Sequence, residues 1–379
     1  MGDSRFDLAV VGGGILGLTH AVTAAEQGFR VLLLERHAYA QGASIRNFGM
    51  VWPIGQPFCG PYDLARSSRE RWIQVASRAG FLAEPCGSLF VAHHADEWQV
   101  LGEYQQVALD QGLELELLPP DQVQQRSPAV NPDSLQGGLF SPWEVRVNPR
   151  QAIPAITRYL QTLPGVEVLH GACVIRAGDG SVETADGRRW SARHILVCGG
   201  DELSLLYPHV LQNAGLRQTK LHMLRTTPQP VEFRIGPHLA SGLTLRHYDS
   251  FANCPSLDAV KQRIARDQPE LDQYGIHVMA SQTEAGELIL GDSHEYGPEI
   301  EIFHKQRIDD LILRELRKVF RFPNWELQQR WVGYYAKFPG GIVYRQTPEP
   351  GVELITGVGG NGMTLCWGLA AETLASLTN

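Results

Sequence analysis

Long apolar runs, basic clusters and paired cysteines are all missing from this 379-residue sequence. No apolar stretch approaches 18 residues, and the first residues carry neither a basic leader nor a cleavage site, so we expect a cytoplasmic protein with no membrane anchor. The six cysteines form no CxxC pair and no Cys/His spacing typical of zinc, which favours reduced thiols and no metal site. With 33 basic against 41 acidic residues, the formal net charge is −8, and we expect no nucleic-acid partner.

The composition is that of an ordinary globular enzyme. Hydrophobic residues make up 43% of the chain and charged residues 20%, so a substantial core can form. A chain of this length exceeds one small domain, and we expect two packed domains.

A strand, a glycine turn and a helix follow one another at the start of the chain. Residues 6–11 are apolar, residues 18–27 have a helical pattern, and the GxGxxG spacing between them is met by Gly12, Gly14 and Gly17. The missing side chains allow a tight turn and the close approach of a pyrophosphate, which the positive end of the helix attracts. A second apolar run ends at Glu35, an acid placed to accept hydrogen bonds from a ribose. This order predicts a domain that binds NAD or FAD.

The segment after Glu35 favours FAD. Residues 42–50, GASIRNFGM, resemble the GAS-x-R-N-x-G-M stretch of the D-amino-acid-oxidase-like flavoenzymes, a family that includes glycine oxidase and sarcosine oxidase. Residues 166–174, 194–200 and 354–365 resemble further stretches of that family in the same order. The resemblance implies non-covalent FAD, because residues 334–355 lack the cysteine through which sarcosine oxidase attaches its flavin.

The glycine motif and the resemblance together predict a set of cofactor contacts along the whole chain. They are Gly12, Gly14, Ile15, Leu16, Gly17, Glu35, Arg36, Ser44, Arg46, Asn47, Gly49, Met50, Val174, Gly199, Gly200, Gly359, Gly360, Asn361, Gly362, Met363 and Thr364.

The expected fold is α/β, with a Rossmann-like FAD-binding domain and an α+β substrate domain built on a mixed sheet, as in D-amino-acid oxidase and glutathione reductase. The FAD domain is assembled from residues 1–55, 150–215 and 330–379, and the substrate domain from residues 56–149 and 216–329. Strand-like runs in the second domain include residues 243–248. Residues 250–275 are interpreted either as a mobile lid or as an ordinary surface helix.

The resemblance implies oxidation of a small primary or secondary amine. A hydride passes to flavin N5, the resulting imine hydrolyses to an aldehyde and an amine, and O2 reoxidises the flavin to give H2O2. A narrower resemblance, at residues 51–57 and 286–297, is to a subgroup associated with aminophosphonate breakdown and favours N-methyl-2-aminoethylphosphonate. The alternatives are a 2-hydroxy acid dehydrogenase or oxidase, a glycine- or sarcosine-type amino-acid oxidase, and a non-catalytic or tRNA-modifying flavoprotein.

Two departures from those relatives guide the substrate prediction. Tyr335 stands where amino-acid oxidases carry a carboxylate-binding arginine, and Ile289 stands where sarcosine oxidase carries an oxygen-activating lysine. Lys337, Arg46 and His294 are the candidates for that charge. A phosphonate needs several converging donors, so the predicted substrate anchors are Arg225, Arg246, His247, Tyr248, His294 and Tyr335. The catalytic candidates are Tyr335, His294 and Lys337.

Overall fold

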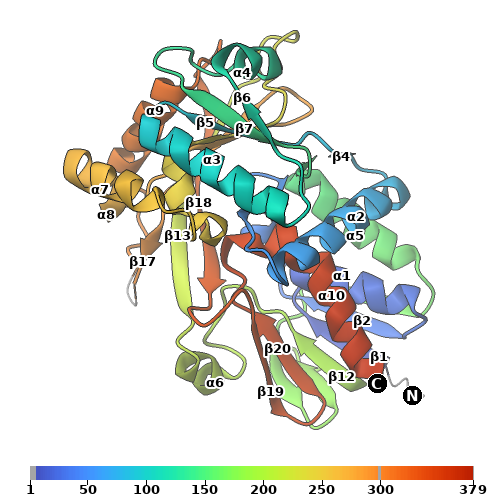
Figure 1. Cartoon of the computed structure of the whole chain (residues 1–379). Coiled ribbons are helices and arrows are strands. Elements are labelled where there is room, and N and C mark those ends of the chain that lie inside the picture. The colour runs from blue at the N-terminus through green and yellow to red at the C-terminus, as the bar shows by residue number, and fades with distance from the viewer. Residues whose placement is uncertain (1–5, 298–299, 379) are drawn as a thin grey trace.

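The computed structural model describes residues 6–297 and 300–378. Figure 1 shows two large sheets, one with helices gathered over it near the two chain ends and one forming the opposite half of the molecule. A small third sheet between them contains β3 (Met50–Val51), β8 (Val145–Val147) and β4 (Ala83–Glu84). Within the described ranges, no helix is both long and apolar enough to cross a membrane.

The first sheet has a parallel centre flanked by antiparallel strands. Its order is β10 (Val174–Gly178), β11 (Ser181–Thr184), β12 (Arg189–Val197), β1 (Phe6–Val11), β2 (Val31–Glu35) and β9 (Val166–His170), and β12 also pairs with β20 (Val352–Thr356), which pairs with β19 (Tyr344–Glu349). Strands β1 and β2 are apolar almost throughout because both faces are covered. Leu8 and Leu33 pack into the core on one face, whereas Ala9 and Leu32 pack into the core on the other.

Four helices cover one face of this sheet, namely α1 (Ile15–Glu26), α2 (Pro61–Ala79), α5 (Pro149–Thr162) and α10 (Gly362–Thr378) (Figure 1). The position of α2 corrects the predicted domain boundary at residue 56. Helix α2 packs on α10 through Trp72, whose indole N–H donates to the Met363 carbonyl at 2.7 Å. The apolar face of α2 is therefore buried with the predicted FAD domain rather than with the substrate domain. On the opposite side of the sheet, a short helix, α6 (Pro208–Asn213), contributes Leu211 to the core.

The second sheet is mixed, as expected. Its order is β17 (Glu295–Tyr296), β13 (Arg217–Thr226), β16 (Leu288–Gly291), β15 (Met279–Gln282), β14 (His238–Ser241), β5 (Ser88–Ala92), β7 (Gly137–Ser141) and β6 (Glu116–Leu118), with β18 (Leu327–Lys337) paired to β13. Since β18 runs antiparallel to β13 over nearly its whole length, residues 330–337 belong to this sheet. This corrects the second predicted boundary, at residue 330.

Five helices accompany the second sheet: α3 (Ala95–Asp110), α4 (Pro120–Arg126), α7 (Leu257–Asp267), α8 (Pro269–Gln273) and α9 (Gln306–Val319). Helix α7 lies in the region interpreted as a lid or a surface helix. It buries Val260 and Ile264, and Arg263 pairs with Asp96 and Glu97 of α3. The surface-helix interpretation is therefore the one that this structure supports.

The strand predicted at residues 243–248 is wrong. Strand β14 ends at Ser241, and residues Gly242–Arg246 form a 3₁₀ helix, η3. A Cβ on Gly242 would lie 2.1 Å from the Glu97 carboxyl carbon, so glycine alone leaves room for that side chain at the turn. The turn directs His247 and Tyr248 away from the sheet and toward the cavity described next.

Candidate active site

A cavity of about 720 Å³ lies between the two sheets. Its walls combine the ends of β1, β2 and β12 and the start of α10 with residues from β13, β18 and the loops of the second sheet. It is large enough for an extended dinucleotide and a small substrate, since ligand sites commonly measure about 300–1,000 Å³.

The first glycine turn shapes one end of the cavity. Gly12 has a φ of +109°, and its N–H donates to the Leu34 carbonyl at 2.8 Å. A Cβ on Gly17 would lie 1.9 Å from the Gly12 carbonyl oxygen, so Gly17 allows α1 to approach β1. Gly14 and the first residues of α1 face the cavity, where the helix N-terminus favours a negative group.

Glu35 is buried at the end of β2 on the cavity wall. One carboxylate oxygen accepts from the Gly13 N–H at 2.8 Å, and the other accepts from the His37 N–H at 2.9 Å. These bonds hold the carboxylate in place beside the glycine turn, where the predicted ribose contact requires it.

The GASIRNFGM segment packs against this turn. The Ser44 hydroxyl accepts from the Ile15 N–H at 2.8 Å, which joins the segment to α1. The Asn47 side chain accepts from the Gly49 N–H, also at 2.8 Å. At Gly49, with a φ of +75°, a Cβ would lie 1.9 Å from the Val147 carbonyl oxygen. The glycine therefore seats the segment on β8.

A second bare backbone surface comes from the carboxyl ends of β12 and β20. Gly200 and Gly360 line the cavity, and a Cβ on either would meet no atom within 4 Å. The start of α10 closes this wall at Gly362 and Met363. Exposed backbone at two helix starts, a fixed acid and this volume fit FAD, and the start of α1 would suit its negative diphosphate.

Most predicted cofactor contacts line the cavity, and four do not. Gly17, Gly49, Met50 and Thr364 lie behind its wall. Thr364 acts on its neighbours instead, because its hydroxyl accepts from the Trp52 N–H at 3.0 Å. The contacts on the wall are Gly12, Gly14, Ile15, Leu16, Glu35, Arg36, Ser44, Arg46, Asn47, Val174, Gly199, Gly200, Gly359, Gly360, Asn361, Gly362 and Met363.

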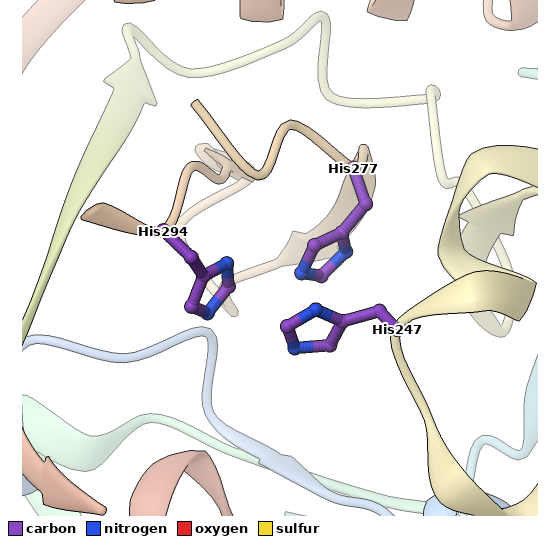
Figure 2. A group of neighbouring side chains, drawn as sticks. All are labelled: His247, His277 and His294. Carbon is purple, nitrogen blue, oxygen red and sulfur yellow. The ribbon is translucent and has the colours of Figure 1, made fainter. Parts of the chain in front are cut away.

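Three histidines meet at the other end of the cavity, as Figure 2 shows. His247 follows η3, His277 precedes β15, and His294 follows β16. The ring centroid of His247 lies 3.9 Å from that of His277 and 4.3 Å from that of His294. Asp292 is buried beside them, with one oxygen 2.9 Å from His277 Nε2.

Burial sets the protonation of this group. It lowers the pKa of His294 to about 4 and holds the pKa of His247 well below its usual range. Burial opposes ionisation of Asp292 as well, but the neighbouring histidines, His277 first, keep the pKa of its carboxyl below the ordinary value. At neutral pH, His247 and His294 are therefore neutral imidazoles beside a carboxylate.

Tyr335 and Lys337, both on β18, extend this polar end. Burial raises the pKa of Tyr335 well above its usual value, so its hydroxyl stays a hydrogen-bond donor. The Lys337 ammonium lies 5.8 Å from the centre of the Tyr296 ring. Among the residues that the structure describes, no carboxylate is close enough to Lys337 to form an ion pair.

Two of the predicted substrate anchors, Arg225 and Arg246, do not face the large cavity. Arg225 pairs with Glu287 and lines a separate, much smaller pocket, together with Ile289. Arg246 pairs with Asp272 and donates to the Ile276 carbonyl at 2.7 Å. Neither arginine lines the large cavity, because each is held by a carboxylate of its own domain.

The sequence analysis missed His277 and Asp292, which both line the cavity. Each lies at the end of a recognisable strand, but neither spacing nor a motif links them. Their backbones face one another across the sheet, with the Asp292 N–H donating to the His277 carbonyl at 2.9 Å. A prediction of the β15–β16 pairing would have brought them together.

Solved structures of known proteins have a similar fold. The chain is similar in fold to glycine oxidase from Bacillus cereus ATCC 14579, with a TM-score of 0.77 at 17% identity over 99% of this chain and 95% of that one. An L-alpha-glycerophosphate oxidase from Mycoplasma pneumoniae, solved with FAD bound, has a TM-score of 0.77 at 16% identity over the same shares of both chains.

Two relatives named as oxidising amines are similar in sequence. One is the 4-methylaminobutanoate oxidase (formaldehyde-forming) of Paenarthrobacter nicotinovorans, 29% identical over 50% of this chain and 24% of that protein. The other is the mitochondrial sarcosine dehydrogenase of Mus musculus, 24% identical over 67% of this chain and 27% of that protein. The chain thus spans about a quarter of the length of the curated relatives it matches.

The family model described as FAD dependent oxidoreductase (DAO) matches residues 7–377, almost the entire chain. The predicted fold and the predicted cofactor, FAD, are confirmed by this match and by the related structures. The chain belongs to the DAO family of FAD dependent oxidoreductases.

Proposed function

We propose that this protein oxidises a small primary or secondary amine, with an aminophosphonate such as N-methyl-2-aminoethylphosphonate as the favoured substrate. Bound FAD supplies a hydride acceptor at N5. The amine leaves as an imine, which water hydrolyses to an aldehyde and an amine. The proposed electron acceptor is O2, which is reduced to H2O2.

The polar end of the cavity carries the aminophosphonate proposal. Lys337 offers a cation that no described carboxylate neutralises, and Tyr335 and Tyr248 line the same wall. Tyr335 takes the place of the arginine that holds an amino-acid carboxylate in relatives. A phosphonate can accept hydrogen bonds from several separate donors, whereas a carboxylate is suited to the planar bidentate guanidinium of an arginine. This set of donors therefore favours a phosphonate over a carboxylate.

His294 is the proposed hydrogen-bond acceptor for the neutral amine. An amine must be neutral before its hydride leaves, and removal of water from the closed cavity already disfavours its ammonium form. Because burial lowers the pKa of His294 to about 4, its imidazole is unprotonated at neutral pH and can accept a hydrogen bond from the amine. Strong general-base catalysis is not required of it.

Lys337 is the proposed oxygen-activating cation. The position expected to carry that charge is occupied by Ile289, which packs with Leu221, Met223 and Tyr335. Lys337 and Arg46 both line the cavity wall, but Arg46 donates to the Val332 carbonyl, whereas no described carboxylate pairs with Lys337, so Lys337 is the cation proposed to act there. A Lys337→Met variant should reduce its flavin normally and reoxidise it more slowly, whereas Lys337→Arg should retain faster reoxidation.

Non-covalent attachment of FAD is also part of the proposal. Cys366, which follows the last glycine loop, is fully buried, and its thiol lies 3.6 Å from the Met363 carbonyl oxygen. Acid precipitation of the protein should release all of its flavin.

Two alternatives have support of their own. An Escherichia coli relative named for anaerobic glycerol-3-phosphate dehydrogenase, 29% identical over 33% of this chain and 23% of that protein, favours an alcohol such as a 2-hydroxy acid. The name of the mouse sarcosine dehydrogenase favours an amino acid of the glycine or sarcosine type.

Anaerobic reduction separates these substrates. N-methyl-2-aminoethylphosphonate, sarcosine, glycine and lactate are added one at a time to the purified protein, and the visible flavin spectrum is recorded. Bleaching by the aminophosphonate alone supports the proposal. Bleaching only by sarcosine or glycine would show that Tyr335 does not exclude carboxylates, and bleaching only by lactate would overturn amine oxidation.

A further inference from the structure

The three histidines form a compact cluster that sequence spacing did not reveal. One ring nitrogen from each of His247, His277 and His294 lies within 4.8 Å of the nitrogens of the other two. The rings come from three separate segments and turn toward one another (Figure 2). Such convergence of lone-pair donors is the arrangement that a metal ion requires.

The charge of the cluster suits a cation. Ring nitrogens of the three histidines converge here, and the Asp292 carboxylate lies 2.9 Å from His277 Nε2 and 3.9 Å from His294 Nε2. A divalent ion placed against this cluster would be attracted by the Asp292 carboxylate, whereas Lys337 and Tyr335, the donors proposed for a phosphonate, lie on β18 outside the cluster.

Unpartnered polar atoms also indicate a bound ligand at this cluster. Neither ring nitrogen of His277 has a hydrogen-bond partner among the described residues, and neither does one oxygen of Asp292. His277 Nε2 lies 2.9 Å from that oxygen, close enough for the carboxylate to orient the ring, and His277 Nδ1 faces no described partner. Buried polar groups normally find partners, so the histidine is oriented for a ligand that completes the set.

We propose that His247, His277 and His294 bind one divalent transition-metal ion, with Asp292 as an outer carboxylate that orients His277. Imidazole ligands suit zinc, copper, iron and nickel. A carboxylate behind a ligating histidine is the usual supporting partner. Sites with three protein ligands keep an open position, and here it faces the flavin cavity because all three histidines line the cavity wall. A bound ion would occupy the lone pair that His294 otherwise offers to the amine, so at this residue the metal and the hydrogen bond to the amine are alternatives.

Metal stoichiometry of the FAD-loaded protein tests this site. Protein stripped with a chelator is titrated with Co²⁺ and Zn²⁺, and binding is followed by calorimetry and by the visible absorption of Co²⁺. About one equivalent should bind, with proton release only where a histidine was protonated. A wild-type protein that binds neither ion at one equivalent overturns the proposal without recourse to any variant.

Variants locate the ion. His277→Ala and His294→Ala should weaken binding by about 100-fold or more, and Asp292→Asn by about 10- to 100-fold. His209→Ala, which removes an exposed histidine, should bind normally. His304→Ala should also bind normally; it removes a ring from the second histidine and aspartate group, His222, His304 and Asp309, where Arg330 already pairs with Asp309. Retained FAD absorbance shows that each variant is folded.

The outcomes separate this inference from the proposed function. Unchanged binding in His277→Ala and His294→Ala, or its loss in His304→Ala, would overturn the site. If the protein binds no metal but its flavin is still bleached by an amine, the metal site alone is overturned. A protein that binds metal at this site, but that no amine bleaches, would overturn amine oxidation alone.

Discussion

The two ends of the cavity are built by different means. At the end near α1, glycines shape the wall: Gly12 lines it, and Gly17 behind it has no side chain, which lets α1 approach β1. At the opposite end, the wall is made of side chains, including His247, His277 and Tyr335, which arrive from separate elements. A site made of backbone is encoded locally, whereas a site made of side chains depends on how distant segments pack.

The largest expected effect is at the backbone end. In Gly17→Ala, the new Cβ would meet the Gly12 carbonyl oxygen at 1.9 Å, so α1 must move away from β1. We expect the free energy of unfolding to fall by about 3 kcal/mol or more, with loss of FAD during purification. Denaturant unfolding and flavin content measure both effects.

The matched control is a glycine of the other domain. A Cβ on Gly102, inside α3, would meet no atom within 4 Å. Gly102→Ala should keep FAD and raise the free energy of unfolding by up to about 1 kcal/mol. Equal damage in both variants would contradict the account of the glycine turn.

The second effect is expected at Glu144, a fully buried carboxyl that does not line the cavity. Glu144 accepts from the Ile54 N–H at 3.0 Å and from the Ser88 hydroxyl at 2.8 Å, and burial raises its pKa to about 7. Between about pH 4.5 and pH 7, the folded chain keeps the Glu144 proton that the unfolded chain has lost. Stability from this group is therefore full below pH 4.5 and falls by about 3 kcal/mol as the pH rises through 7.

Glu144→Gln removes that titration. Urea unfolding midpoints at pH 5 and pH 8, with FAD in excess, should differ less in Glu144→Gln than in the wild type. The same pH dependence in both proteins would mean that Glu144 ionises normally in the fold.

A smaller effect is expected at the side-chain end. Tyr335→Phe removes one hydroxyl donor from the cavity wall, and loss of one such hydrogen bond costs about 1.4 kcal/mol. The KM for the aminophosphonate should rise about tenfold, while FAD binding stays unchanged. Tyr39→Phe, at a residue that is 59% exposed, is the control and should alter neither. A KM unchanged in Tyr335→Phe would remove Tyr335 from the substrate site.

The smallest effect is expected at Arg225. Because Arg225 pairs with Glu287 outside the cavity, Arg225→Ala should change the KM by less than about twofold. Steady-state kinetics on the same substrate measure this directly. An increase in KM as large as that of Tyr335→Phe would restore Arg225 as an anchor and require the Glu287 pair to break on binding.

Sequence patterns led to cavity-lining residues where the motif and the local conformation coincide. The Gly12, Gly14 and Glu35 pattern and the GASIRNFGM segment led to cavity-lining residues because strand, turn and helix are contiguous in sequence. The patterns were less accurate for Gly49 and Thr364, which hold neighbouring backbone in place behind the wall. A motif identifies the residues that a site needs, but it does not separate those that touch a ligand from those that position the loop.

The sequence by itself determined the Rossmann-like layer and FAD, because a missing Cβ, an apolar strand and a helix start act over a few residues. Only the tertiary structure decided which charged side chains face the cavity. Arg225 and Arg246 are held by Glu287 and Asp272, whereas His277 and Asp292 meet across the β15–β16 pair. The direction of a long polar side chain follows from its nearest opposite charge and from strand register, and both arise from contacts between distant segments.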